Sequence, residues 1–124
     1  MERLSIEDLL LIAEAVLGTP AEGLARRVRL GAAAAALAAA DRGPDLADRA
    51  AVLCTRLVRD RPLPQGNERV ALLATLELVA RNHGTWRSSH DDIELLAVAI
   101  ERLTARELSE AAFALWIRER VTTR

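Results

Sequence analysis

The sequence predicts an all-α protein, folded as one compact helical bundle over residues 1–124. Apolar residues recur at helical spacing in most segments, and helix-capping patterns alternate with glycine and proline stops. No segment combines alternating apolar and polar residues with β-branched enrichment, as a strand would. A chain of 124 residues is long enough to bury one core.

Three helical pieces are expected in the first 41 residues. Residues 5–8 resemble a capping box, and the apolar residues that follow end at Gly18. Residues 19–22 form a full capping box with proline at the first helical position, so a second helix is expected there. Gly31 is expected to interrupt it, which leaves residues 32–40 as a third, alanine-rich piece.

The middle of the chain predicts two longer helices. Residues 45–59 carry apolar side chains on one side. Residues 61–66 cannot continue that helix, because two prolines and a glycine fall within six residues. Asn67 can cap a helix over residues 68–81, which is apolar on nearly every side and is therefore expected at the centre of the bundle.

The last third predicts two more helices. Gly84 is expected to end the central helix in the left-handed conformation. Asp91 and Asp92 start the next helix, and a capping box at residues 104–107 starts the last one.

Composition and charge exclude several classes of function. The 17 basic residues, all arginine, are balanced by 18 acidic ones, which argues against general nucleic-acid binding. A lone cysteine excludes an internal disulfide framework, and no Cys/His cluster has zinc spacing. The first residues lack the apolar core of a signal peptide, and the longest uncharged run, residues 30–40, is about half a membrane span. We therefore expect a soluble, cytoplasmic protein that contacts neither membrane nor nucleic acid.

The loop before the helix at 68–81 is the candidate for chemistry. Gly66, Asn67, Glu68 and Arg69 place free backbone N–H groups and a guanidinium at a helix N-terminus, which attracts anions. Gly66 would let the backbone approach a ligand closely. The alternative is that Asn67 only caps a core helix and Arg69 lies on its exposed first turn.

Residues 61–69, with the sequence RPLPQGNER, resemble the signature loop of the Fic/Doc (Fido) family, His-Pro-Phe-x-Asp/Glu-Gly-Asn-Gly/Lys-Arg. Residues 4–10, 47–58, 69–72 and 81–84 are also similar to short Doc-type (death-on-curing) toxins of bacterial toxin–antitoxin pairs. The resemblance implies a Fido-like helical bundle. It also implies transfer of phosphate or AMP from ATP, with Mg²⁺, to a protein hydroxyl.

In the family, the motif histidine acts as the base, the acidic residue holds Mg²⁺, the Gly-Asn amides cradle phosphate and the arginine pairs with phosphate oxygens. By this resemblance, the candidate phosphate- or nucleotide-binding residues here are Gly66, Asn67, Glu68, Arg69 and Arg61. ATP and Mg²⁺ are implied as cofactors by the resemblance alone.

Three departures fall where the chemistry happens. Arg61 stands at the position of the base, and a guanidinium stays protonated and has no acceptor. Gln65 stands at the position of the metal-binding carboxylate, and a neutral amide is a weaker Mg²⁺ ligand. Glu68 adds a carboxylate beside the phosphate cradle and repels an anion. We therefore expect no catalytic base and no metal ligand in this loop.

Other reactive side chains are weaker candidates. His83 lies about 20 Å along the central helix from the loop. His90 lies where a helix is capped, and Cys54 lies mid-helix among apolar residues, as a core residue would. Arg61 either forms a two-arginine clamp with Arg69 or pairs with an acid such as Asp60 or Glu68.

The sequence favours a Doc-like protein that binds a partner protein or a phosphate ligand without ordinary Fic catalysis. The expected partner is an antitoxin-like helix or the product of a neighbouring gene, docked on the small side chains of residues 32–40. Changing Ala33 or Ala36 to Glu is then expected to break the complex and spare the fold. The alternatives are an active nucleotide-dependent toxin and a helical interaction domain whose motif similarity is accidental.

Overall fold

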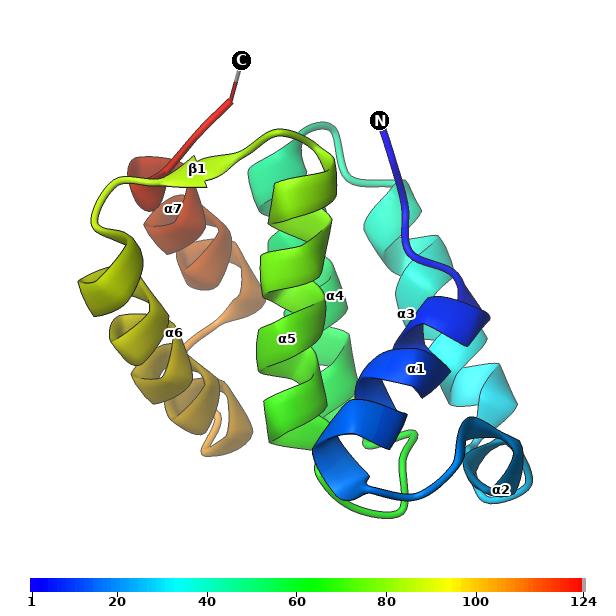
Figure 1. Cartoon of the computed structure of the whole chain (residues 1–124). Helices are drawn as coiled ribbons and strands as arrows, with labels where there is room; N and C mark the ends of the chain where they lie inside the picture. The colour runs from blue at the N-terminus through cyan, green and yellow to red at the C-terminus, as the bar shows by residue number, and fades with distance from the viewer. Residues whose placement is uncertain (124) are drawn as a thin grey trace.

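The computed structural model describes residues 1–123, over which the chain is an all-α bundle, as predicted (Figure 1). The helices are α1 (Ile6–Leu17), α2 (Ala21–Ala25), α3 (Leu30–Asp41), α4 (Leu46–Asp60), α5 (Asn67–Arg81), α6 (Ser89–Thr104) and α7 (Glu110–Arg120). Two short strands, β1 (Thr85–Trp86) and β2 (Val121–Thr122), pair antiparallel. Within residues 1–123, no helix combines the length and the apolar character that crossing a bilayer requires.

Two helices share the centre of the bundle. α4 packs against α3, α5, α6 and α7, and nine of its fifteen residues are buried. α5 packs against α1, α4 and α6. In Figure 1, α1, α2 and α3 lie on one side of this pair and α6 and α7 on the other. The helix predicted at the centre of the bundle, α5, therefore shares that position with α4. It is not buried on every side, because Leu73 and Ala80 are exposed on its outer side.

Two predicted helix starts are confirmed in detail. The Ser5 side chain accepts the Asp8 N–H, and the Asp8 carboxylate accepts the Ser5 N–H at 2.8 Å, so the capping box of α1 is complete. Gly18, at φ 71°, ends that helix. The Asp45 carboxylate accepts the Asp48 N–H at 2.9 Å and starts α4.

The predicted capping box at residues 19–22 is wrong. The Glu14 carboxylate, from the last turn of α1, accepts the Ala21 N–H at 3.0 Å and takes the role expected of Thr19. The resulting α2 is only five residues long. Gly31 does not interrupt a helix either, because α3 begins at Leu30 and continues through it.

The predicted exposed alanine face is also wrong at Ala33 and Ala36. Both residues are buried, with 3% and 1% of their surface exposed, in the core shared with α4. Small side chains let two helices approach closely, so the alanines of α3 serve the packing against α4. The exposed side of α3 carries Ala34 and Ala35 instead.

The turn after α5 differs from the prediction in one residue. His83, not Gly84, adopts the left-handed conformation, at φ 59°. Gly84 is needed for a close approach, because a Cβ there would lie 2.7 Å from Cγ1 of Val79.

The predicted start of the last helix at residues 104–107 is wrong. Thr104 belongs to the last turn of α6, where its hydroxyl donates to the Ile100 carbonyl at 2.9 Å. Arg106 breaks the helix at φ 59°, and α7 begins after Ser109, whose side chain accepts the Ala112 N–H.

The three aromatic side chains of the sequence form one cluster between β1 and α7. The ring centroids of Trp86 and Trp116 are 6.3 Å apart, and those of Phe113 and Trp116 are 6.0 Å apart. The Arg120 guanidinium lies 4.3 Å from the Trp116 ring centroid and 3.6 Å from the Asp92 carboxylate of α6. The cluster therefore connects the two-stranded ribbon to α6 and α7.

Candidate functional site

The signature-like loop, residues 61–66, connects α4 to α5 at one end of the bundle (Figure 1). Pro62 and Leu63 are buried, whereas Pro64 and Gln65 are exposed. Leu63 belongs to an apolar cluster formed with residues of α1, α2 and α5, so it anchors the loop at the position of the motif's phenylalanine.

Asn67 closes this loop instead of capping α5, which corrects the prediction. The residue is buried, its Oδ1 accepts the Leu63 N–H at 3.0 Å, and its Nδ2 donates to the Leu63 carbonyl at 3.0 Å. Gly66 occupies the N-cap position and offers no side chain to the helix. The amide of Asn67 is therefore occupied within the loop itself.

Gly66 has a structural requirement of its own. Its φ is 74°, and a Cβ at this position would lie 2.8 Å from Cδ2 of Leu17. The left-handed backbone is the main reason for a glycine here, and the contact with the end of the flexible Leu17 side chain adds a smaller penalty. The sequence predicted that Gly66 lets the backbone approach a ligand closely. In the structure, it is the end of α1 that lies close to Gly66.

Arg29 holds the loop in place through two hydrogen bonds, a role that the sequence did not predict. Its backbone N–H donates to the Pro62 carbonyl at 2.8 Å, and its Nη1 donates to the Asp60 carbonyl at 2.8 Å. Arg61 lies between these two contacts with a left-handed backbone, at φ 47°. No local pattern could have identified Arg29, because it lies 31 residues before Asp60 in the sequence.

The charged side chains of the loop face carboxylates. Of the two alternatives for Arg61, the structure has the ion pair, with Nη1 3.9 Å from Oε1 of Glu68. Arg69 lies on the exposed first turn of α5, where it lines a hollow of about 170 Å³ between α5 and α6. Glu68 and Glu101 line the same hollow. An anion bound there would meet two carboxylates beside the guanidinium.

Gln65, at the position of the family's metal-binding acid, is an exposed neutral side chain. Among the described residues, a group of three side chains that could hold a metal ion is found on the first turn of α6, at His90, Asp91 and Glu94. All three are exposed, and Nε2 of His90 lies 3.4 Å from Oε1 of Glu94, one helical turn away. Such a pair is ordinary on a helix surface, so we do not assign a metal centre to it.

The remaining reactive side chains lie away from the loop. His83 is exposed beyond the last turn of α5, at the opposite end of that helix. Burial raises the pKa of the Cys54 thiol to about 12, against a smaller opposing effect of a hydrogen bond with Thr75. A thiol with such a pKa is not a nucleophile at neutral pH, which agrees with the expected core role.

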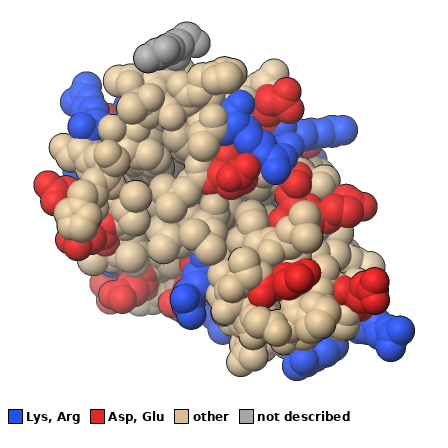
Figure 2. All heavy atoms as spheres, viewed as in Figure 1, with Lys and Arg blue, Asp and Glu red and all other residues tan. Residues whose placement is uncertain are grey.

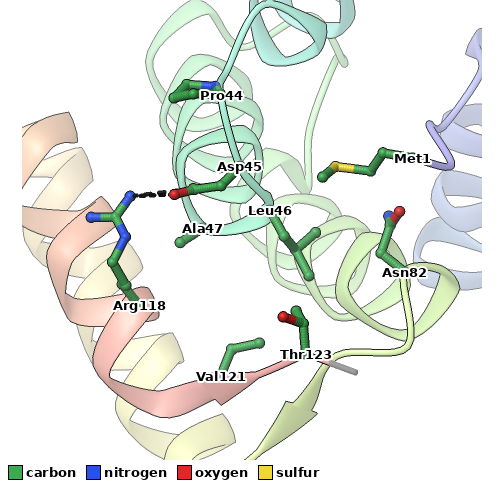
Figure 3. A pocket seen from close by; sticks show the side chains of 9 residues that line it. All are labelled: Met1, Pro44, Asp45, Leu46, Ala47, Asn82, Arg118, Val121 and Thr123. Atoms are coloured by element: carbon green, nitrogen blue, oxygen red, sulfur yellow. Dashed lines mark hydrogen bonds and ion pairs between the residues drawn. The ribbon is translucent and has the colours of Figure 1, made fainter.

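A hollow of about 540 Å³ lies where the two ends of the described chain meet (Figure 3). Its charged side chains form ion pairs, and its one amide side chain is hydrogen-bonded to the backbone. Arg118 lies 3.1 Å from Asp45 and 3.0 Å from Asp48, and Asn82 exchanges hydrogen bonds with the backbone of Glu2. Apart from Thr123, the rest of the lining is apolar and consists of Met1, Pro44, Leu46, Ala47 and Val121.

A second hollow, of about 560 Å³, is the α1–α5 groove. It is lined by apolar side chains of both helices, namely Leu11, Ile12, Ala15, Leu73, Leu76 and Ala80. At one end, Arg81 donates two hydrogen bonds to the Asp8 carboxylate, at 2.9 and 3.0 Å, and one to Glu77 at 2.9 Å. The contact with Arg81, helped by the Ser5 backbone N–H, lowers the pKa of Asp8 from 3.8 to about 2.

Comparison with known proteins finds no family model that matches the chain and no curated protein that matches it significantly. The resemblance to the Fic/Doc family therefore stays a prediction from the sequence.

Proposed function

We propose that the chain is a Doc-like protein of the Fic/Doc (Fido) family that acts by binding a protein partner and has lost the family's transfer reaction. The RPLPQGNER loop and the all-α bundle around α4 and α5 support the family assignment. The base position holds Arg61, whose guanidinium cannot accept a proton, and the metal-ligand position holds Gln65, whose neutral amide is a weaker Mg²⁺ ligand than a carboxylate.

The observation that carries the proposal is the use of the retained motif residues to hold the loop together. Asn67 is bonded to Leu63 through both polar atoms of its amide, and Gly66 packs on Leu17. Each of these contacts gives a retained motif residue a role in stabilising the fold. Selection for the fold can therefore keep the motif after the base and the metal ligand are gone.

A protein partner is favoured over a phosphate ligand by the charges and by the exposed apolar surface. Glu68 and Glu101 flank Arg69, which disfavours an anion. The α1–α5 groove leaves apolar side chains in contact with water, as a docking surface does. The partner expected for a Doc-like protein is an antitoxin-like helix or the product of a neighbouring gene. The single buried thiol of Cys54 fits a reducing compartment, so we propose a cytoplasmic location.

The test is a transfer assay with radiolabelled ATP, Mg²⁺ and bacterial lysate. The natural sequence is compared with the triple variant Arg61→His, Gln65→Asp, Glu68→Gly, which restores the family's motif. We expect no label transfer from the natural sequence and transfer or nucleotide binding by the restored variant. A general base alone contributes about 10²–10⁴-fold to such a reaction.

An Arg106→His variant, changed outside the loop, controls for the added imidazole. Label transfer by the natural sequence would overturn the proposal and favour the active toxin. If neither version transfers label and neither binds nucleotide in calorimetry, the family assignment fails.

A further inference from the structure

The outer side of α5 carries an apolar strip that the bundle covers only in part. Leu72, Leu73 and Leu76 follow one another at helical spacing on the side of α5 opposite its buried residues. Leu73 has 39% of its surface exposed. Leu72 and Leu76 are half-buried and also contact the core. Together with Leu11 of α1, which has 60% of its surface exposed, Leu73 and Leu76 line one apolar groove, and a continuous apolar patch on a monomer marks a contact surface.

The strip continues onto both neighbouring helices. On one side it forms the α1–α5 groove with Leu11 and Ala15 of α1. On the other side, Leu72 shares the hollow of about 170 Å³ with Ala97 of α6. We name this surface the α1–α5–α6 face and define it by Leu11, Ala15, Leu72, Leu73, Leu76 and Ala97.

The margins of this face are acidic. Leu11 lies between Glu7 and Glu14 on α1, and Ala97 lies between Glu94 and Glu101 on α6, each within one helical turn. All four glutamates are exposed. Figure 2 shows the wide uncharged area over α5, with acidic side chains on the sides of both α1 and α6.

The arginines beside the face do not reverse this charge. Arg69 lines the smaller hollow together with two glutamates. The donors of Arg81 are directed at Asp8 and Glu77, at 2.9–3.0 Å, so this guanidinium is already neutralised by two carboxylates. The face as a whole is apolar in the middle and negative at its edges.

We propose that the α1–α5–α6 face binds an amphipathic helix of a partner protein, whose apolar stripe is flanked by lysines or arginines. This rests on the proposed binding function and names the site and the chemistry of the partner. A groove between two helices accepts a third helix through side chains at positions i, i+3, i+4 and i+7. The glutamates at both margins then meet basic residues on both flanks of that helix.

The same charges argue against a second copy of this chain as the occupant. In a two-fold symmetric dimer the face would meet itself, and the glutamates of both copies would be brought together. Like charges across an interface disfavour association, whereas opposite charges speed and stabilise it.

The test uses two synthetic 18-residue helical peptides with one and the same leucine stripe, flanked by lysine in one peptide and by glutamate in the other. Binding to the full chain is measured by titration calorimetry at low and at physiological salt. We expect the lysine peptide to bind at least about tenfold more tightly, and the difference to shrink as salt rises, because the margin charges are exposed.

Variants of matched exposure locate the site. Leu11→Ser with Leu73→Ser should weaken binding of the lysine peptide about tenfold or more. Leu115→Ser, on α7, should leave it unchanged, and Leu115 is as exposed as Leu11, at 58% against 60%. Circular dichroism of each variant verifies the fold.

Three results would overturn the inference. These are equal binding of the two peptides, lysine-peptide binding that survives the Leu11/Leu73 change, and a dimer in solution that this change dissociates. Any of them can occur while the natural sequence still fails to transfer label from ATP, so failure of this inference is distinguishable from failure of the proposed function.

Discussion

Gly66 and Gly31 have opposite requirements, although both were expected to mark special backbone positions. Gly66 is left-handed and lies against Leu17, whereas Gly31 lies in the first turn of α3 with nothing within 4 Å of an added Cβ. Gly66→Ala should lower the free energy of unfolding by about 1–3 kcal/mol, since it combines a strained φ with a clash. Gly31→Ala should raise it by about 0.5 kcal/mol through helix propensity and a less flexible unfolded chain.

The measurement is urea denaturation followed by circular dichroism. A Gly66→Ala protein as stable as the natural one would show that the loop can turn away from α1. The prediction that Gly66 contacts a ligand would then apply again.

The sequence identified the residues of the candidate site but not their partners. Asn67 and Gly66 are recognisable from the motif, and a carboxylate beside Arg61 was one of two stated alternatives. The bonds from Asn67 to Leu63 and from Arg29 to Pro62 were not predictable. A buried amide bonds to whichever backbone group the fold places beside it, and the contact of Arg29 depends on how α3 packs on α4.

At the level of elements, α3 illustrates how an alanine helix can be core on one side and surface on the other. Ala36 is 1% exposed and faces α4, while Ala35, one residue earlier, is exposed. Ala36→Glu should destabilise the protein by more than about 3 kcal/mol, because a carboxylate would be buried without a partner. Ala35→Glu should change the stability by no more than about 0.5 kcal/mol.

Hydrogen exchange of the amides of α3 and α4 measures this effect locally. If Ala36→Glu kept the natural protection, residue 36 would not be packed against α4, and the docking of a partner on that side of α3 would again be open.

Helix boundaries were predictable where the cap is local and unpredictable where another element supplies it. The caps at Ser5 and Asp45 use donors three residues away. The capping box at Ser5 is as predicted, and the helix expected over residues 45–59 starts one residue later, with Asp45 as its cap. Glu14, and not Thr19, accepts the first free N–H of α2. The hydroxyl of Thr104 donates to the Ile100 carbonyl within α6 and does not cap α7. A local sequence pattern cannot tell which side chain will bond to a helix terminus, because that depends on the angle at which the chain leaves the preceding helix.

Across the whole molecule, two aspartates are paired with arginines 73 residues away. Asp8 binds Arg81, and Asp45 binds Arg118. The pKa of Asp8 is lowered to about 2, chiefly by Arg81, and that of Asp45 is lowered by the Asp48 N–H and by Arg118. A carboxyl with a lowered folded pKa stabilises the fold above its unfolded pKa, and this contribution is lost as the pH falls toward the folded value.

Asp8→Asn should therefore cost about 1 kcal/mol at pH 7, after allowance for the partial exposure of the pair. Between about pH 4 and pH 2 the variant and the natural protein should converge. Urea denaturation at a series of pH values measures the difference, and Glu107→Asn, at an exposed site, is the control. A constant difference down to pH 2 would contradict the assigned pairing.

The clustering of Trp86, Phe113 and Trp116 has a consequence for how any of these changes can be observed. Since the chain has no other aromatic side chain, its intrinsic fluorescence and near-ultraviolet signals report on the β1–α6–α7 side alone. An opening of α1, α2 and the loop would leave both of these aromatic signals unchanged, and by them the protein would seem fully native while its candidate site had come apart. A tryptophan introduced at the exposed Leu11 would give that half of the molecule a reporter of its own.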